Sequence, residues 1–192
     1  MNLFRWKDFL TFGLLGLAST IASIYVTTNL STETPNRAEA IGLMWVVTVL
    51  FWLGYIAILV MRNKFLNSIT FTTAHNIYVI AGDFKVNKSD IEKETSETII
   101  KWKTATNWYG CERSARQGLY LFIKPYPVQA HASLGKVAGY TVGKHMIIGY
   151  KPEEHISKTA YAHELGHVIH REWTGEINEK AAHDFMKNNK LR

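Results

Sequence analysis

Hydrophobic residues are distributed very unevenly along the chain. Two long runs near the N-terminus, residues 9–26 and 40–61, contain no charged residue. A helix of roughly 20 apolar residues is long enough to cross a hydrocarbon core about 30 Å thick. Both runs are apolar on every face, which does not fit the half-buried helices of a soluble core. We therefore predict a two-helix transmembrane hairpin over residues 1–64, with the lipid bilayer as its partner, and a separate domain over residues 65–192.

A cleaved signal peptide is the alternative for the first run, because Arg5 and Lys7 precede it. The run continues past its small residues and a second run follows closely, so we favour two spans. Arg5, Lys7, Arg62 and Lys64 flank the outer ends of the spans, whereas the loop between the spans has only Arg37. The positive-inside rule then predicts that both termini and the second domain lie in the cytoplasm.

Beyond residue 64 the pattern changes to short apolar runs and amphipathic segments. Residues 91–103 have helical periodicity, and a second helix is expected over residues 153–171, before Gly175. Residues 104–116 are polar and read as a loop. One or two strands are expected within residues 68–80, which end in the apolar run 77–80, and further strands at residues 119–123, 137–141 and 145–150. This order predicts an α+β fold, with a small mixed sheet and several helices.

The inward face of the first of these helices can be read from its periodicity. Apolar and small side chains recur at the spacing of one helical face. The predicted inward residues are Ile91, Thr95, Thr98, Ile99 and Trp102.

The chemically most specific feature is the segment His163-Glu164-Leu165-Gly166-His167, which has the pattern HExxH. On a helix, residues i and i+4 share a face, with Cβ atoms about 5–6 Å apart. Both imidazoles can then reach one zinc ion, with Glu164 beside the open coordination position as a general base toward water. The pattern predicts a zinc-dependent hydrolase, and a peptidase in particular.

A catalytic zinc site usually takes three protein ligands. The metzincin pattern would require a histidine where this chain has Trp173, so that class is excluded. A further helix is expected after Gly175, and it contains Glu176, Glu179 and His183. These three residues share a helical face at i, i+3 and i+7, so the residues themselves leave all three open as the third ligand.

The HExxH segment followed by Glu179-Lys180-Ala181-Ala182 and Phe185 resembles the minimal gluzincins, whose core is similar to a pared-down thermolysin. It is especially similar to the small repressor-cleaving and stress-response metallopeptidases of bacteria and their mobile elements. In that family the glutamate of E-x-x-A-x-x-F is the third zinc ligand. The resemblance implies a zincin-like domain, a protein or peptide substrate, and Glu179 as the third ligand.

This chain departs from thermolysin-like enzymes in two ways. Only 11 residues separate His167 from Glu179, and His183 stands where those enzymes have a supporting aspartate.

Zincins also pair an edge strand with the substrate backbone, and the strands at residues 137–141 and 145–150 are candidates for that edge. A second donor for the oxyanion is expected besides the metal. The candidates are Tyr140, Tyr150, Tyr161, His170 and His183.

The composition of the chain argues against nucleic-acid binding, an internal disulfide and intramembrane proteolysis. Residues 62–192 hold 19 Lys/Arg and 13 Asp/Glu, but the positive charge is dispersed and no nucleic-acid motif occurs, so no nucleic acid is expected as a partner. Cys111 is the only cysteine, which rules out an internal disulfide. The segment around the motif, residues 158–173, is too polar for an intramembrane protease.

Two other functions remain open from the sequence. One is a non-catalytic, membrane-tethered module that binds zinc or a peptide. The other is a metal-independent membrane protein with a chance motif. The presence of Glu164 argues against the first, because a purely structural zinc site has no use for a base.

Overall fold

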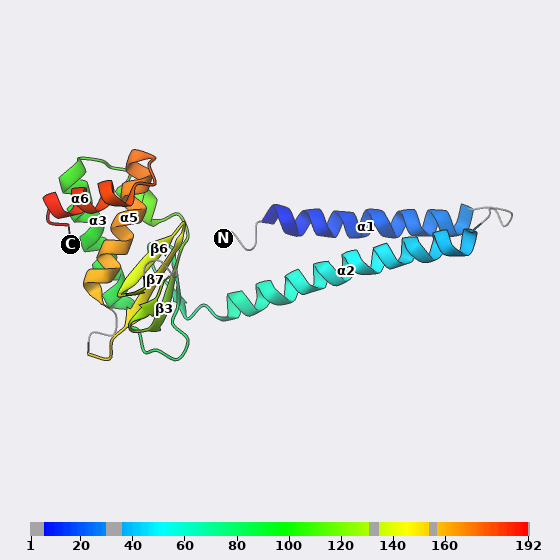
Figure 1. Cartoon of the computed structure of the whole chain (residues 1–192), viewed down its shortest axis with the longest axis horizontal. Coiled ribbons are helices and arrows are strands. Elements are labelled where there is room, and N and C mark those ends of the chain that lie inside the picture. Colours follow the sequence, from blue (N-terminus) through cyan, green and yellow to red (C-terminus); the bar gives the residue numbers. More distant parts are fainter. Residues whose placement is uncertain (1–5, 30–35, 131–134, 154–156, 192) are drawn as a thin grey trace. The chain divides into compact units, whose positions relative to one another are not determined.

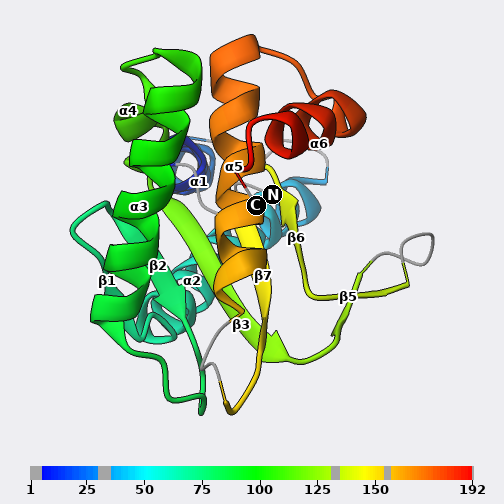
Figure 2. The same ribbon diagram turned by 90° about the vertical axis from the view of Figure 1, so that its left-hand side faces the viewer.

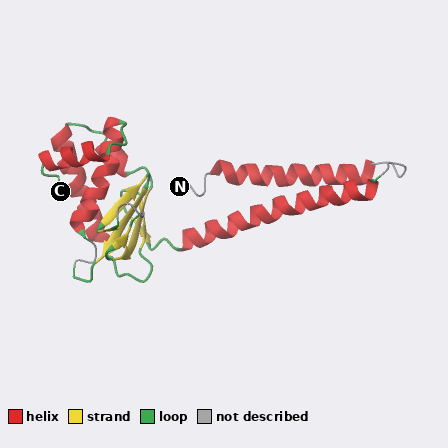
Figure 3. Ribbon diagram, viewed as in Figure 1, coloured by secondary structure: helices red, strands yellow, loops and turns green. Residues whose placement is uncertain are grey.

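The computed structural model describes residues 6–29, 36–130, 135–153 and 157–191 (Figure 1). Arg5 and residues 154–156 of one predicted helix lie outside the described residues. The chain divides into two units, Met1–Asn67 and Ser68–Arg192. The first unit is helical and the second combines helices with a small mixed sheet, so the protein is α+β as predicted (Figure 3).

The first unit is a pair of helices, α1 (Trp6–Asn29) and α2 (Arg37–Asn67). With 24 and 31 residues, they are about 36 and 46 Å long at 1.5 Å per residue. Both helices are long and apolar enough to cross a membrane. The expectation of two apolar helices is confirmed.

Polar contacts join the two helices of this hairpin. Ser23 Oγ lies 2.8 Å from Thr48 Oγ1, and both side chains are buried. The indole of Trp52 donates to Thr20 Oγ1 at 3.0 Å, and the ring packs over Gly16, where a Cβ would come 3.4 Å from it. Interhelical hydrogen bonds and small residues of this kind hold helices together in a bilayer, where apolar surface supplies no net driving force.

The second unit contains a five-stranded sheet in the order β1-β2-β3-β7-β6. β2, β3 and β7 are parallel neighbours, while β1 and β6 run antiparallel at the two edges. Of the two strands predicted as the edge, β6 lies at the edge and β7 lies inside the sheet, so the second prediction is wrong. The strand bounds are β1 (Phe71–Thr72), β2 (Ile77–Ile80), β3 (Leu119–Pro125), β6 (Gly139–Val142) and β7 (His145–Tyr150). A separate two-stranded sheet pairs β4 (Val128–Gln129) with β5 (Lys136–Val137).

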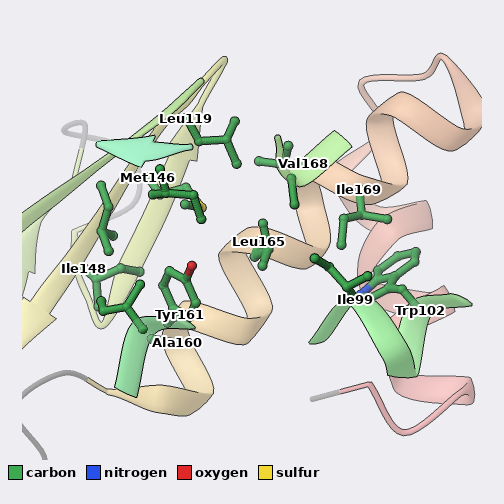
Figure 4. Close-up of a cluster of buried hydrophobic side chains, with 14 of the residues drawn as sticks. Ile99, Trp102, Leu119, Met146, Ile148, Ala160, Tyr161, Leu165, Val168 and Ile169 are labelled. Carbon is green, nitrogen blue, oxygen red and sulfur yellow. The ribbon is translucent and has the colours of Figure 1, made fainter. Parts of the chain in front are cut away.

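The helices of this unit lie on one face of the five-stranded sheet (Figure 2). They are α3 (Lys88–Thr106), α4 (Cys111–Ala115), α5 (Lys158–Thr174) and α6 (Glu179–Asn188). Leu165, Val168 and Ile169 of α5 pack in the centre of the buried cluster, between strand residues and α3 (Figure 4). All five predicted inward residues of α3 are buried. Burial of each large apolar side chain contributes about 1.5–3 kcal/mol.

Local capping explains where the structure differs from the predicted helix bounds. α5 begins at Lys158 and not near Glu153, because the Ser157 side chain accepts the Ala160 N–H and caps the helix there. α5 ends at Thr174, and its C-cap is Gly175, whose φ of 73° favours glycine, so the predicted glycine stop is confirmed.

Two predictions about flanking segments are corrected by the structure. The predicted loop at residues 104–116 contains the short helix α4. The last helix starts only at Glu179, because the Asn178 side chain caps it by accepting the Ala181 N–H. Glu176 therefore lies in the connector before α6 and does not share a helical face with Glu179 and His183.

Candidate metal centre

Three histidine side chains converge between α5 and α6. His163 and His167 lie one turn apart on α5, and His183 comes from α6. The Nε2 atoms of His163 and His167 are 3.1 Å apart, and those of His167 and His183 are 3.0 Å apart. One ligand atom from each of the three residues lies within 4.8 Å of the others. The three imidazoles therefore present their ring nitrogens to a common point.

Three histidines that converge in this way could hold a metal ion such as zinc. Zinc–imidazole bonds are about 2.0–2.1 Å long, and tetrahedral angles would place the ligand nitrogens about 3.3 Å apart. The two Nε2 distances of 3.1 and 3.0 Å are close to that value, and all three ligand atoms lie within 4.8 Å of one another. Three neutral imidazoles are a donor set that zinc accepts, and they leave a fourth coordination position for water. His163, His167 and His183 are thus the residues that could hold the metal.

Close packing of α6 against α5 places His183 at this point. Met186, one turn beyond His183, is fully buried and lies over Gly166 of the motif. A Cβ at position 166 would come within 2.7 Å of the Met186 sulfur, so glycine permits the close approach of the two helices. Phe185 of α6 also stacks on Trp102 of α3, with ring centroids 5.2 Å apart. These contacts fix the rotation of α6 about its axis.

The structure does not bring Glu179 or Glu176 to the two motif histidines. Glu179 is exposed and is the first residue of α6, one helical turn, or about 6 Å along the axis, before His183. Its carboxylate does not belong to the group of three side chains that could hold a metal ion. Glu176 is exposed in the connector. Of the three candidates that the sequence left open, the structure groups His183 with the two motif histidines. Glu179, the third ligand that the gluzincin resemblance implies, stays a prediction.

Glu164 is positioned by the edge strand β6. Its side chain is buried, with an exposed fraction of 6%. The Thr141 hydroxyl donates to the Glu164 carboxylate at 2.7 Å. A Cβ at Gly139 would lie 3.4 Å from Glu164 Cγ, so β6 passes directly against this side chain. Residues 139 and 141 share one side of the strand, and this side faces Glu164.

Burial raises the pKa of Glu164 to about 7. The hydrogen bond from Thr141 lowers the pKa, and the negative charge of Glu179 raises it. A carboxyl group with a pKa near neutrality can both accept and release a proton. A cation held by the neighbouring histidines would favour the ionised form.

Thr141 is the site residue that sequence reasoning missed. It lies 23 positions before Glu164, on a different element. The only sequence signal is its place on a predicted edge strand, two positions after a glycine. That signal indicates which residues share a side of the strand, but not which helix residue they meet.

Two of the five predicted oxyanion donors, Tyr161 and His170, are buried in the core. The Tyr161 hydroxyl is fully buried and lies 2.6 Å from Thr95 Oγ1, in the core between α5 and α3 (Figure 4). His170 is buried in an aromatic cluster with Trp102, Trp173 and Phe185. Both residues therefore have structural roles.

The two other tyrosines are on the sheet. Tyr150 stacks on Phe84, with ring centroids 4.7 Å apart. Tyr140 alternates with Gly139 and Thr141 on β6, so it lies on the side of the strand that faces away from Glu164. His183, the fifth candidate, belongs to the convergent histidines.

The chain matches no protein-family model, no curated protein and no solved structure.

Proposed function

We propose that this protein is a membrane-anchored, zinc-dependent endopeptidase with a zincin-like catalytic domain. The proposal is supported by the convergence of His163, His167 and His183 and by the buried carboxyl group of Glu164, the residue that follows His163 in the motif. The placement of the motif helix behind a mixed sheet with an antiparallel edge strand is consistent with such a domain.

In the proposed hydrolysis, Glu164 transfers the proton and Thr141 positions Glu164. Bound zinc supplies Lewis acidity toward a water molecule and toward the scissile carbonyl. Glu164 accepts a proton from the attacking water as the water oxygen bonds to the carbonyl carbon. The same carboxyl group then delivers that proton to the leaving amine as the C–N bond breaks. Thr141 holds the carboxyl group in place during both transfers.

The substrate in this proposal is a protein or peptide in extended conformation. β6 is an edge strand, so one side of its backbone is not paired within the five-stranded sheet. An extended peptide can add to such an edge by main-chain hydrogen bonds. Because Gly139 and Thr141 of the same strand face Glu164, a peptide along β6 would pass close to the metal centre.

The hairpin of α1 and α2 anchors the domain in this proposal. We infer that both helices span the bilayer and that the catalytic domain lies on the cytoplasmic side, because lysine and arginine are concentrated at the outer ends of the two spans.

Metal removal tests the proposed function. The full chain, purified in lipid nanodiscs, is expected to contain one zinc per chain and to cleave peptides from a mixed library. Treatment with 1,10-phenanthroline should stop cleavage, and added zinc should restore it. If zinc is bound stoichiometrically but no peptide is cut, the protein is a non-catalytic zinc-binding module. If no zinc is bound, the metal centre itself is refuted.

Loss of the Thr141 hydroxyl is expected to slow hydrolysis without loss of metal. Thr141→Val keeps the side-chain volume but removes the hydrogen bond to Glu164, and a hydrogen bond to a charged group contributes about 1.5–3 kcal/mol. We expect kcat to fall roughly 10- to 100-fold. The matched variant Thr141→Ser retains a hydroxyl and should restore most of the rate. Equal rates in the valine variant and the wild type would exclude this positioning role.

A further inference from the structure

The sheet of the second unit has an outer face, opposite the helices, that is lined by aromatic and aliphatic side chains. We define the outer face by Tyr78, Ile80, Tyr120, Phe122, His145 and Ile147. Each of these side chains is partly exposed, whereas the residues that alternate with them are buried against the helices. Among the described residues, α3, α4, α5 and α6 all lie on the other face (Figure 2).

The rings of the outer face form a continuous layer across three strands. Tyr78 stacks on Tyr120 with centroids 5.2 Å apart, and Tyr120 stacks on His145 at 5.3 Å. Phe122 contacts the same histidine ring at 5.8 Å. At the edge of the sheet, Val142 of β6 is opposite His145 and is 56% exposed. An apolar patch that is built in this way marks an interaction surface.

The charged residues on and beside the outer face are lysines. The five strands of the sheet contain no aspartate, glutamate or arginine, and Lys124 is their one lysine. Lys124 is exposed, and by strand alternation it lies on the outer face. Beside it, the Lys151 ammonium lies over the ring of Tyr126, 4.8 Å from its centroid. That tyrosine covers Gly149 at the end of β7 and is 48% exposed.

Tyrosine and lysine together are typical of the membrane–water interface. Tyrosine rings prefer the headgroup level because they have an apolar body and a polar hydroxyl. Lysine stems lie along apolar surface while the ammonium reaches anionic headgroups. Residues 62–192 have a net charge of +6, which adds a general attraction to an anionic leaflet.

The covalent connection keeps this sheet close to the anchor. α2 ends at Asn67 and β1 begins at Phe71, so only three residues connect them. A fully extended connector spans about 14 Å between these two Cα atoms. β1 is an edge strand of the sheet that carries the outer face. A domain on so short a connector stays at the surface of any bilayer that α2 crosses.

We propose that the outer face is a membrane-docking surface, which rests on the headgroup region of an anionic bilayer. This inference rests on the membrane anchoring in the proposed function, but not on the peptidase activity. The aromatic layer enters the interface, and Lys124 and Lys151 contact anionic headgroups. A second copy of the chain covering the same face is the competing occupant, and it is less favoured because two such faces would bring like positive charges together.

Site-specific fluorescence tests the docking surface in the full chain. Val142→Cys, labelled with an environment-sensitive fluorophore, reports on the outer face. Ile100→Cys on α3, 62% exposed, is the matched control on the helical side. Leu50→Cys on α2, also 62% exposed, reports on anchoring. Cys111 is buried, so the unsubstituted chain provides the labelling blank. The chains are placed in nanodiscs of phosphatidylcholine with phosphatidylserine, with or without a nitroxide-bearing lipid.

We expect the nitroxide lipid to quench the labels at Val142 and Leu50 severalfold more than the label at Ile100. A solvent-like label at Val142 beside a quenched label at Leu50 would overturn the docking surface and leave the anchor intact. A label at Val142 that is shielded from water but not quenched by lipid would show that protein covers the outer face. That result would also overturn the membrane-docking surface. An unquenched label at Leu50 would refute the anchor itself, and with it the inference. Zinc content and peptide cleavage are measured separately, so a failure here is distinguishable from failure of the peptidase.

A charge reversal supplies a second measurement. Lys124→Glu should lower the ratio of docked to undocked domain about fivefold or more in phosphatidylserine nanodiscs, since one basic residue near an anionic surface contributes about that factor. The lipid quenching of the label at Val142 reports this ratio. The matched control Lys101→Glu on α3 changes the net charge equally and should have a much smaller effect. Equal effects of the two variants would indicate general attraction only and would contradict docking through the outer face.

Discussion

Replacement of Glu164 by glutamine is expected to stop peptide hydrolysis while zinc remains bound. Glutamine has nearly the same shape, and its amide oxygen can still accept the hydrogen bond that Thr141 donates. It cannot accept a proton from water at neutral pH. General-base catalysis by a positioned side chain contributes about 10²- to 10⁴-fold, so kcat should fall by roughly that factor.

The fold should tolerate this change, because Glu164 is buried and glutamine carries no charge that would need solvation. The measurement is kcat for one defined peptide, with zinc stoichiometry determined on the same sample. Glu179→Gln provides the control, since it removes a nearby but exposed carboxylate. Undiminished cleavage by the Glu164 variant would remove the general base from the proposed mechanism, whatever the metal content.

Removal of the His183 imidazole is expected to weaken zinc binding more than removal of any other side chain on α6. His183 Nε2 lies 3.0 Å from His167 Nε2, whereas Glu179 lies outside the convergent group. Loss of a group that only supports a ligand costs about 10- to 100-fold in metal affinity. We therefore expect His183→Ala to weaken zinc binding more than about 100-fold, and Glu179→Ala to weaken it about tenfold or less.

Competition with a chromophoric chelator measures both affinities. Circular dichroism and the thermal midpoint should show that both variants fold, since neither side chain is part of the buried core. His183→Gln offers a second, less disruptive replacement. The reverse order, with Glu179→Ala causing the larger loss, would support the third ligand that the gluzincin resemblance implies and would require α6 to rotate relative to α5.

Much of the fold could be predicted from local sequence periodicity. The five inward residues of α3 follow one helical face, and the two charge-free runs predict α1 and α2. The position of β7 inside the sheet could not be predicted in this way, because strand order depends on contacts between segments far apart in the chain.

In the candidate site, too, local features could be predicted from the sequence, whereas contacts between distant segments could not. The i, i+4 spacing of His163 and His167 is a property of one helix, so the sequence predicts that pair directly. The third residue depends on how α6 rotates against α5, and this is set by Met186 over Gly166 and by the Asn178 cap. A shared helical face cannot distinguish Glu179 from His183. The contact between Thr141 and Glu164 is equally non-local.

If α2 crosses a bilayer as proposed, the three-residue connector between α2 and β1 also limits which molecules the second unit can meet. In the proposed membrane-anchored peptidase, a domain on so short a connector would search for substrate in two dimensions, and its rate would depend on the number of copies per unit area of membrane. Tethering of both reactants to one surface raises their effective concentration, to the millimolar range for short linkers. Polypeptides embedded in the same membrane gain from this confinement, and freely diffusing ones do not. In the proposed peptidase, selectivity would thus arise from location, before any side chain of the candidate site has contacted a substrate.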